Sequence, residues 1–374
     1  MKQLLKPFFI VALSVVLFSC SSRPLTSDRE EDLSQFEDYD KLIVVESIET
    51  TEPEKRESPE LAPSEPAQPP TAAPPPSPVA PKAPPKAAPK ASAPKAAPVA
   101  KAPEKPIEQT VEDPAPPPQT SGPRQPELED SEGFVGRRPL RDPFRVGERV
   151  TLSVSYFRVV AGTLDLEVLP FVQVNGEKSY HFRLMAKSNN FFSRIYSVED
   201  TAETFVNFED LRPYNMSMSI RESRQMKEIR SVHNWETMIV NYRERSLNRR
   251  GRESNRDFEW ELLPYAQNVL SGTFYMRNFT LTPGKTIEYH VADRGKNIVV
   301  QIDVLRRETL KTDLGEFQTV VVQPRFEIDG VFRPTGDIFF WLTDDDRKLI
   351  VRFSADVRIG QVVGQVIGIE KGRP

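Results

Sequence analysis

The sequence predicts a mainly β protein: a large curved antiparallel sheet, or an open barrel-like domain, with one helix, preceded by a disordered spacer rich in proline, alanine and lysine. Apolar and polar residues alternate in many short runs after residue 139, which is typical of half-buried antiparallel strands. Before that residue, 24 of the 35 prolines lie between Pro53 and Pro126, among almost no branched or aromatic residues. Such a composition cannot bury a core and favours an extended chain.

The N-terminus has the features of a bacterial secretion signal. Two lysines precede an apolar run from Phe8 to Phe18, which is shorter than the span of about 20 residues that a transmembrane helix needs. The residues before and including Cys20, Leu-Phe-Ser-Cys, resemble the lipobox at which lipoproteins are acylated, and Cys20 is the only cysteine. We therefore expect residues 1–19 to be a lipoprotein signal peptide and Cys20 to carry the lipid. Serine rather than aspartate at position 21 favours the outer membrane, with the protein facing the periplasm.

Two segments are expected to join Cys20 to the folded part of the chain. Residues 20–52 form an acidic tether, whose apolar residues 42–45 we interpret as an isolated hydrophobic segment rather than a short strand that docks on a partner. Residues 53–138 form the proline-rich spacer. We expect it to hold the folded domain away from the membrane, and a solvated spacer is favoured over specific binding to an anionic polymer such as peptidoglycan.

Residues 139–374 are expected to form one antiparallel β-domain. Lysine and arginine total 34 there and aspartate and glutamate total 32, so the charge gives no case for binding nucleic acid. Turn-like sequences separate the alternating runs. The predicted strands include residues 150–156, 164–168, 180–184, 216–220, 258–262, 287–291 and 298–304, with turns at Asn175-Gly176, Pro283-Gly284, Arg294-Gly295, Asp329-Gly330 and Asp344-Asp345-Asp346.

One segment breaks the alternation. Apolar residues recur at spacings of three and four between Ala266 and Arg277, which predicts a helix over residues 265–278. With a single amphipathic helix available, the sheet must curl around it or leave an apolar groove. Leu270 and Phe274 are therefore candidates either for a plug that fills the sheet or for a lid over such a groove.

Four blocks of the domain are distinctive: GERVTLSVSYFRVVAGTLDLEV, the helix block followed by LTPGK, RRETLKTDLGEFQTVVVQP, and IFFWLTDDDRKLIVRFSADVRIGQVVGQV. In their order, over about residues 145–368, they resemble the bacterial envelope family known as domain of unknown function 3108. The resemblance implies a β-rich periplasmic or membrane-attached protein and no assigned activity. Where members often have Asp-Pro-Leu-Ser, this chain has Asn268-Val269-Leu270-Ser271.

The domain lacks motifs for catalysis. Its histidines, His181, His233 and His290, have no metal-ligand spacing, and the first and last lie in the polar phase of their strands, where we expect them to face solvent. No serine lies in a hydrolase motif. Three consecutive aspartates at 344–346 suit a turn better than a calcium loop, with Asp344 as the capping residue. We therefore expect no enzyme activity, metal or cofactor.

Arginines concentrate in the segment RERSLNRRGRESNR. Their guanidinium groups are suited to bind phosphate or carboxylate, which makes the segment a candidate anion-binding site, although a solvated hairpin tip is favoured. The six residues are Arg243, Arg245, Arg249, Arg250, Arg252 and Arg256.

These observations favour a non-catalytic outer-membrane lipoprotein that acts as an envelope scaffold or adaptor. Its expected partners are the membrane, through Cys20, and peptidoglycan or an envelope protein. The alternative is a carrier that binds a lipid or acyl chain in an apolar groove of the curved sheet. A filled interior would favour the scaffold, and a continuous apolar cavity beside the helix would favour the carrier.

Overall fold

The computed structural model describes Phe36, Tyr39 and residues 41–48, 141–328, 331–332, 337–357 and 360–373. The predicted signal peptide, Cys20 and the predicted spacer 53–138 lie outside the described residues, as does the predicted turn at Asp329-Gly330.

One antiparallel sheet is built from two meanders. The first meander runs from β2 to β9 and the second from β10 to β16, and they join where β16 pairs with β2. The strands of the first are β2 (Glu148–Tyr156), β3 (Val159–Val174), β4 (Glu177–Ser188), β5 (Glu199–Asn207), β6 (Asn215–Glu222), β7 (Gln225–Asn234), β8 (Ile239–Asn248) and β9 (Glu253–Glu261). Those of the second are β10 (Thr286–Asp293), β11 (Lys296–Thr312), β12 (Gly315–Ile328), β13 (Val331–Phe332, paired only with β12), β14 (Ile338–Thr343), β15 (Ile350–Asp356) and β16 (Gln361–Lys371).

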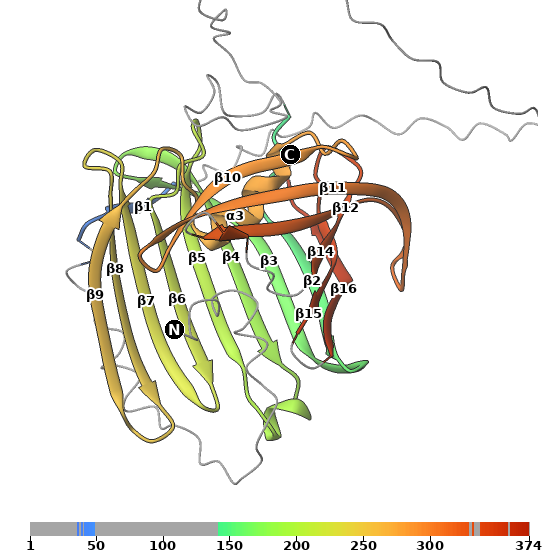
Figure 1. Ribbon diagram of the computed structural model, residues 1–374, viewed down its shortest axis with the longest axis horizontal. Helices are drawn as coiled ribbons and strands as arrows, with labels where there is room; N and C mark the ends of the chain where they lie inside the picture. The colour runs from blue at the N-terminus through green and yellow to red at the C-terminus, as the bar shows by residue number, and fades with distance from the viewer. Residues whose placement is uncertain are drawn as a thin grey trace, which may run out of the picture. The chain divides into compact units, whose positions relative to one another are not determined.

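The sheet is strongly curved but not closed. β9 and β10 are the two ends of the strand order and do not pair with each other. In Figure 1, β10, β11 and β12 cross over the first meander, and the helix α3 (Val269–Tyr275) lies beneath them on the inner side of the curve. The predicted mainly β fold, with an open curved sheet and one helix, is confirmed.

Alternation along the strands places the core on the inner face. Tyr180, Phe182, Ile229 and Tyr242 point inward and pack in the main cluster of buried residues, to which α3 contributes Leu270. The seven runs predicted as strands lie in β2, β3, β4, β6, β9, β10 and β11. A period of two in the sequence thus identifies the inner face, because successive side chains of a strand point to opposite sides.

The helix is shorter than residues 265–278. It begins after Asn268, whose side chain accepts hydrogen bonds from the backbone N–H groups of Leu270 and Ser271, and it passes at Met276 into a 3-10 turn, η3 (Met276–Asn278). The preceding residues are not helical, because Gln267 forms a parallel bridge with Val291 of β10. The residue where the family often has aspartate is therefore an N-cap, a role that aspartate and asparagine both fill.

A buried ion pair fixes the end of η3 to the start of β2. The Arg277 guanidinium donates to both carboxylate oxygens of Glu148, at 2.7 and 3.1 Å, and to the backbone oxygen of Pro143 at 2.9 Å. Both side chains are at most 3% exposed, and Arg347 also contacts Glu148. Because a buried charge without its partner is costly, this cluster holds the helical segment in one position.

The tether docks on the sheet before the proline-rich stretch begins. β1 (Val45–Ser47) pairs with residues Val172–Val174 of β3, and Phe36, only 1% exposed, lies on the outer face with the guanidinium carbons of Arg230 and Arg245 each 4.9 Å from its ring centre. The interpretation of residues 42–45 as an isolated hydrophobic segment is therefore wrong. Residues of the sheet that are distant in sequence complete a small cluster around Phe36.

This docking changes the place of the proline-rich stretch in the chain. Phe36 and Ser47 contact the sheet whose first long strand, β2, begins at residue 148. A chain leaving Cys20 thus reaches the sheet at Phe36, ahead of residue 53. The stretch does not lie between Cys20 and the first contact with the sheet.

The aspartate-rich turn between β14 and β15 is capped by Asp345 rather than by Asp344. The Asp345 carboxylate accepts hydrogen bonds from the Thr343 hydroxyl and from the backbone N–H groups of Arg347 and Lys348. Asp344 and Asp346 instead form ion pairs with Arg307 and Arg141. The aspartates diverge, as adjacent residues in a turn must, and a turn is the structure that the sequence predicts there.

Candidate functional site

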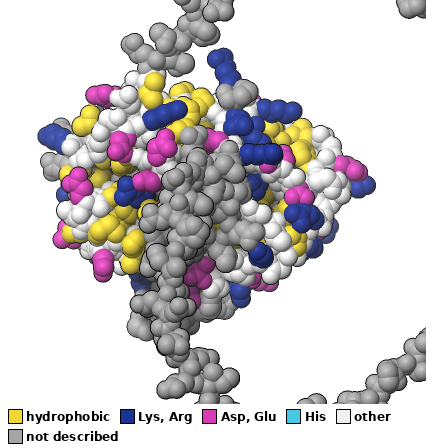
Figure 2. Space-filling model, turned by 90° about the horizontal axis from the view of Figure 1, so that it is seen from above, with side chains coloured by type: hydrophobic (Ala, Val, Ile, Leu, Met, Phe, Trp, Pro, Cys, Tyr) yellow, Lys and Arg dark blue, Asp and Glu magenta, His cyan; other side chains and the backbone are white. Residues whose placement is uncertain are grey.

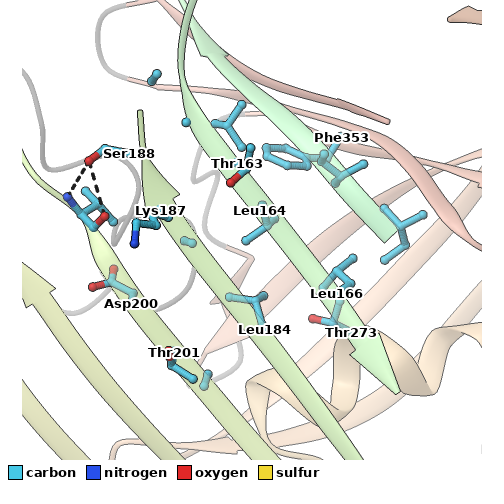
Figure 3. A pocket seen from close by; sticks show the side chains of 18 of the residues that line it. Thr163, Leu164, Leu166, Leu184, Lys187, Ser188, Asp200, Thr201, Thr273 and Phe353 are labelled. Carbon is cyan, nitrogen blue, oxygen red and sulfur yellow. Dashed lines mark hydrogen bonds between the residues drawn. The ribbon is translucent and has the colours of Figure 1, made fainter. Parts of the chain in front are cut away.

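An apolar cavity of about 130 Å³ lies between the inner face of the sheet and α3. Leu164 and Leu166 of β3 and Leu184 of β4 form its floor, with Thr273 of α3 beside them (Figure 3). Phe353 of β15 closes the opposite side, since the curve of the sheet brings the second meander round to face β3. The other lining residues are Leu152, Val154, Ala161, Gly162, Thr163, Ala186, Lys187, Ser188, Phe192, Val198, Asp200, Thr201, Ala202, Met218, Phe340 and Ile350.

The lining residues show that the interior is left unfilled at this end. Val154, Leu164, Leu184 and Phe340 belong to the inward-facing phase of their strands but are only partly buried. Elsewhere on this face, side chains of the same phase are buried, such as Phe182, which is 2% exposed. The helix is too short to cover the whole inner face. The result is a continuous apolar surface beside the helix.

One buried carboxyl group lies in this apolar lining. Asp200 Oδ1 accepts a hydrogen bond from the Arg221 backbone N–H at 2.9 Å, while Oδ2 is buried without a partner among the described residues. Burial, and then repulsion from Glu222, raise the pKa of Asp200 to about 8. At neutral pH this carboxyl group is therefore largely protonated.

Glu222 is buried next to this group. Its Oε2 accepts hydrogen bonds from the Tyr196 hydroxyl and from Gln225 Nε2, both at 2.7 Å. Burial raises the pKa of Glu222, and burial, followed by repulsion from Glu222, raises the pKa of Tyr196. Asp200 and Glu222 were not identified from the sequence. The available signal was a carboxylate in the inward phase of each strand, where most other residues are apolar.

The two helix residues singled out from the sequence lie in the core. Leu270 is 0% and Phe274 2% exposed, and Phe274 stacks on Phe182 with 4.2 Å between ring centres. Their neighbour Thr273 faces the cavity instead. The helix thus packs permanently against the sheet with one side and borders the cavity with another.

The arginine-rich segment is a hairpin whose side chains diverge. Arg243 and Arg245 lie in β8 and point to the outer face, where they contact Tyr39 and Phe36 of the docked tether. Arg243 also pairs with Asp257. Arg256 is opposite Glu244 on the inner phase of β9. The structure therefore does not gather all six arginines into one site; Arg249, Arg250 and Arg252 share the turn.

The histidines are not brought together. His181 is partly buried, with Nε2 at 3.4 Å from Glu203, and His290 is half-buried, with its pKa lowered by burial. His233 is 3% exposed. His181 and His290 lie in the polar phase of their strands, and each is partly exposed. Within the described part of the chain, no three His, Cys, Asp or Glu residues are placed to hold a metal ion.

Comparisons with known proteins identify a family but no function. No helix in the described ranges is long and apolar enough to cross a bilayer. No curated protein matches the chain. A β-barrel-like protein of domain of unknown function DUF1849 from Brucella abortus is similar at 10% identity and a TM-score of 0.40, over 60% of this chain and 98% of that one. A Bacteroides fragilis protein with a YmcC-like fold has 10% identity and a TM-score of 0.30, over 62% of this chain and 99% of that one.

The family model covers most of the folded part of the chain. It matches residues 149–366, which extend from β2 to β16 and include the helix, the cavity and the buried carboxyl groups. The matched residues exceed half of the chain. The protein therefore belongs to the family described as Protein of unknown function (DUF3108).

Proposed function

We propose that this protein is a non-catalytic lipoprotein of the bacterial envelope that binds an acyl chain in the cavity beside α3. The observation that supports the proposal is the continuous apolar lining, in which inward-facing residues such as Leu164 and Leu184 stay partly exposed. A scaffold or adaptor binds peptidoglycan or an envelope protein through its surface and has no use for an internal cavity. The unfilled interior favours the lipid-binding alternative.

The cavity suits the end of an acyl chain. Its volume of about 130 Å³ is close to that of a cavity of about 150 Å³ that stays dry and binds benzene. It therefore accepts a few methylene groups, and the rest of a longer chain must extend through the open end. Each buried methylene contributes about 0.8 kcal/mol.

The proposed cellular setting follows from the N-terminus. Lipidation at Cys20 would anchor the protein in the outer membrane, facing the periplasm, and the proposed function requires no metal or cofactor. Export supports a partner that is a lipid or an envelope component rather than a nucleic acid.

Filling the cavity tests the proposal. In the mature chain from residue 20, carrying Cys20→Ser, Ala186→Trp places a large side chain on the inner face of β4, where the cavity lies. We expect at least a tenfold loss of affinity for a dansyl-labelled fatty acid, measured by fluorescence titration. Leu314→Trp, at a turn residue that is 47% exposed, is the matched control. Equal binding by both variants, with no lipid found by native mass spectrometry of the envelope-purified protein, would refute the proposal.

A further inference from the structure

Five turns at one end of the sheet form a single rim. They are residues 157–158 between β2 and β3, 189–198 between β4 and β5, 223–224 between β6 and β7, 249–252 between β8 and β9, and 357 and 360 between β15 and β16. In Figure 1 this is the lower end of the sheet, opposite the side where β10, β11 and β12 cross.

Backbone hydrogen bonds join these turns to their neighbours. The Asn189 side chain and backbone donate to the carbonyl oxygens of Val160 and Ala161, at 2.6 and 2.8 Å. Ser223 N–H donates to Ser197 O at 3.0 Å, and Arg249 N–H donates to Arg224 O at 2.9 Å. The rim is therefore a fixed surface of the fold rather than a set of independent loops.

The rim exposes large apolar side chains. Phe157 is 58% exposed, Phe191 and Ile195 are each 64% exposed, and Val159 and Val160 are each 50% exposed. Phe191 and Ile195 lie on the 189–198 turn, which is hydrogen-bonded to the start of β3 beside the other three residues. Scattered exposed apolar residues need no explanation, but five at one end of a sheet mark an interaction surface.

The turn that carries Phe157 is conformationally unfavourable. Phe157 and Arg158 have φ angles of 49° and 64°, which is the left-handed region that two-residue hairpin turns usually fill with asparagine and glycine. An aromatic and a long cationic side chain occupy it here, and the Phe157 ring packs over Gly360 of the neighbouring turn. Strain of this kind is retained where the exposed side chains serve a function.

Arginine predominates in the turns of the rim. The described turn residues include six arginines and no carboxylate: Arg158, Arg194, Arg224, Arg249, Arg250 and Arg252. Exposed carboxylates adjoin these turns at Glu199, Glu253, Asp337 and Asp356. At the end seen from above in Figure 2, basic and acidic side chains are interspersed over the visible surface. Arginine combined with exposed aromatic and aliphatic residues matches a bilayer surface, where phosphate groups lie above acyl chains.

The chain toward Cys20 leaves the outer face of the sheet at Phe36. Phe36 contacts Arg230 and Arg245, which lie five and three residues from the rim ends of β7 and β8. The 16 peptide steps from Cys20 to Phe36 reach at most about 56 Å. A lipid at Cys20 would therefore keep the sheet within that distance of the membrane.

We infer that this rim docks on a bilayer containing anionic phospholipids, with Phe157, Phe191 and Ile195 inserted and the arginines bound to phosphate groups. Ala161, Ser188 and Phe192, at or beside the rim, line the cavity, so docking would place the open end of the cavity against the bilayer. The inference stands whether or not the cavity binds an acyl chain.

Vesicle sedimentation tests the inference. The mature chain from residue 20 with Cys20→Ser is mixed with phosphatidylcholine vesicles with or without phosphatidylglycerol, so that neither the signal peptide nor the acyl anchor contributes. We expect binding to the anionic vesicles, and at least a tenfold loss in the triple variant Phe157→Ser, Phe191→Ser, Ile195→Ser. Wild-type failure to bind, which would leave a protein partner for the rim, would overturn the inference.

Two controls isolate the rim. The first is a triple variant at three apolar residues that lie away from the rim and are 37 to 47% exposed: Leu305→Ser, Leu314→Ser, Ile367→Ser. It should change vesicle binding less than twofold. An equal loss in this control, or unchanged binding in the rim variant, would assign the binding to another part of the chain. The second control is fatty-acid affinity in solution, which the rim variant should retain; it separates failure of the rim from failure of the cavity.

Discussion

Truncating Phe274 should destabilise the sheet strongly, because its ring fills the space between the helix and β4. The side chain is 2% exposed and stacks on Phe182, with ring planes 9° apart, while Phe144 lies 6.3 Å away. Phe-to-Ala changes in cores cost about 3–5 kcal/mol through lost transfer energy and the cavity left behind. The stacked pair with Phe182 adds about 0.5–1.5 kcal/mol to the stability, and the substitution removes this pair as well. We expect Phe274→Ala to lower the free energy of unfolding by about 4 kcal/mol.

Urea denaturation, followed by both tryptophan fluorescence and circular dichroism, measures this change. At about 2–4 °C per kcal/mol for a domain of this size, the same loss should lower Tm by roughly 8–16 °C. The matched control is Thr273→Ala, on the same helix but facing the cavity, which should cost under about 1 kcal/mol. A loss below about 1 kcal/mol for Phe274→Ala would mean that the helix is a loosely held lid rather than part of the core.

Three further predictions concern the buried carboxyl group, the helix cap and the docked tether. The pKa of Asp200 is raised from 3.8 to about 8 by burial and by Glu222, so the folded protein holds a proton that the unfolded chain releases. Its stability contribution is present below pH 3.8 and is lost as pH rises toward 8. Asp200→Asn should flatten this dependence and raise stability at pH 8 by about 1–3 kcal/mol in urea melts; an unchanged pH profile would contradict it. Asn268→Ala should cost about 2–3 kcal/mol, because it removes the cap and leaves buried Thr204 Oγ1 without its donor, although Asn215 O still accepts from the Thr204 hydroxyl. A loss below about 0.5 kcal/mol, the size of an ordinary surface substitution, would argue against the cap. Phe36→Ala should remove about 2–4 kcal/mol of stabilisation from burial and cation–π attraction. Residues 41–48 should therefore lose hydrogen-exchange protection, while the protection of β4 stays unchanged. Equal protection of β1 in both proteins would show that Phe36 does not hold the tether.

Local patterns predicted the strands well because alternation is a property of neighbouring residues. The hairpin turn at Asn175-Gly176, with φ angles of 52° and 82°, follows from two residues that tolerate the left-handed region. Contacts between distant segments were less accessible. The helix starts late because Gln267 bridges to β10, and Phe36 docks on arginines nearly 200 residues later in the chain. A cavity is harder still, since it depends on what fails to cover Leu164 and Leu184 after every strand has been placed.

The open edge of β9 has a consequence for self-association. Among the residues that the structure describes, no strand pairs with the far side of β9, whereas the edge of β10 is partly covered by the bridge to Gln267. Free edges template pairing with other chains, and charged residues discourage it. Along β9, ESNRDFEWE, alternation places the carboxylates Glu253, Asp257, Glu259 and Glu261 on one face, and all four are exposed. A second copy pairing there would bring like charges together, so the sheet is able to remain open between β9 and β10 without growing into a fibre.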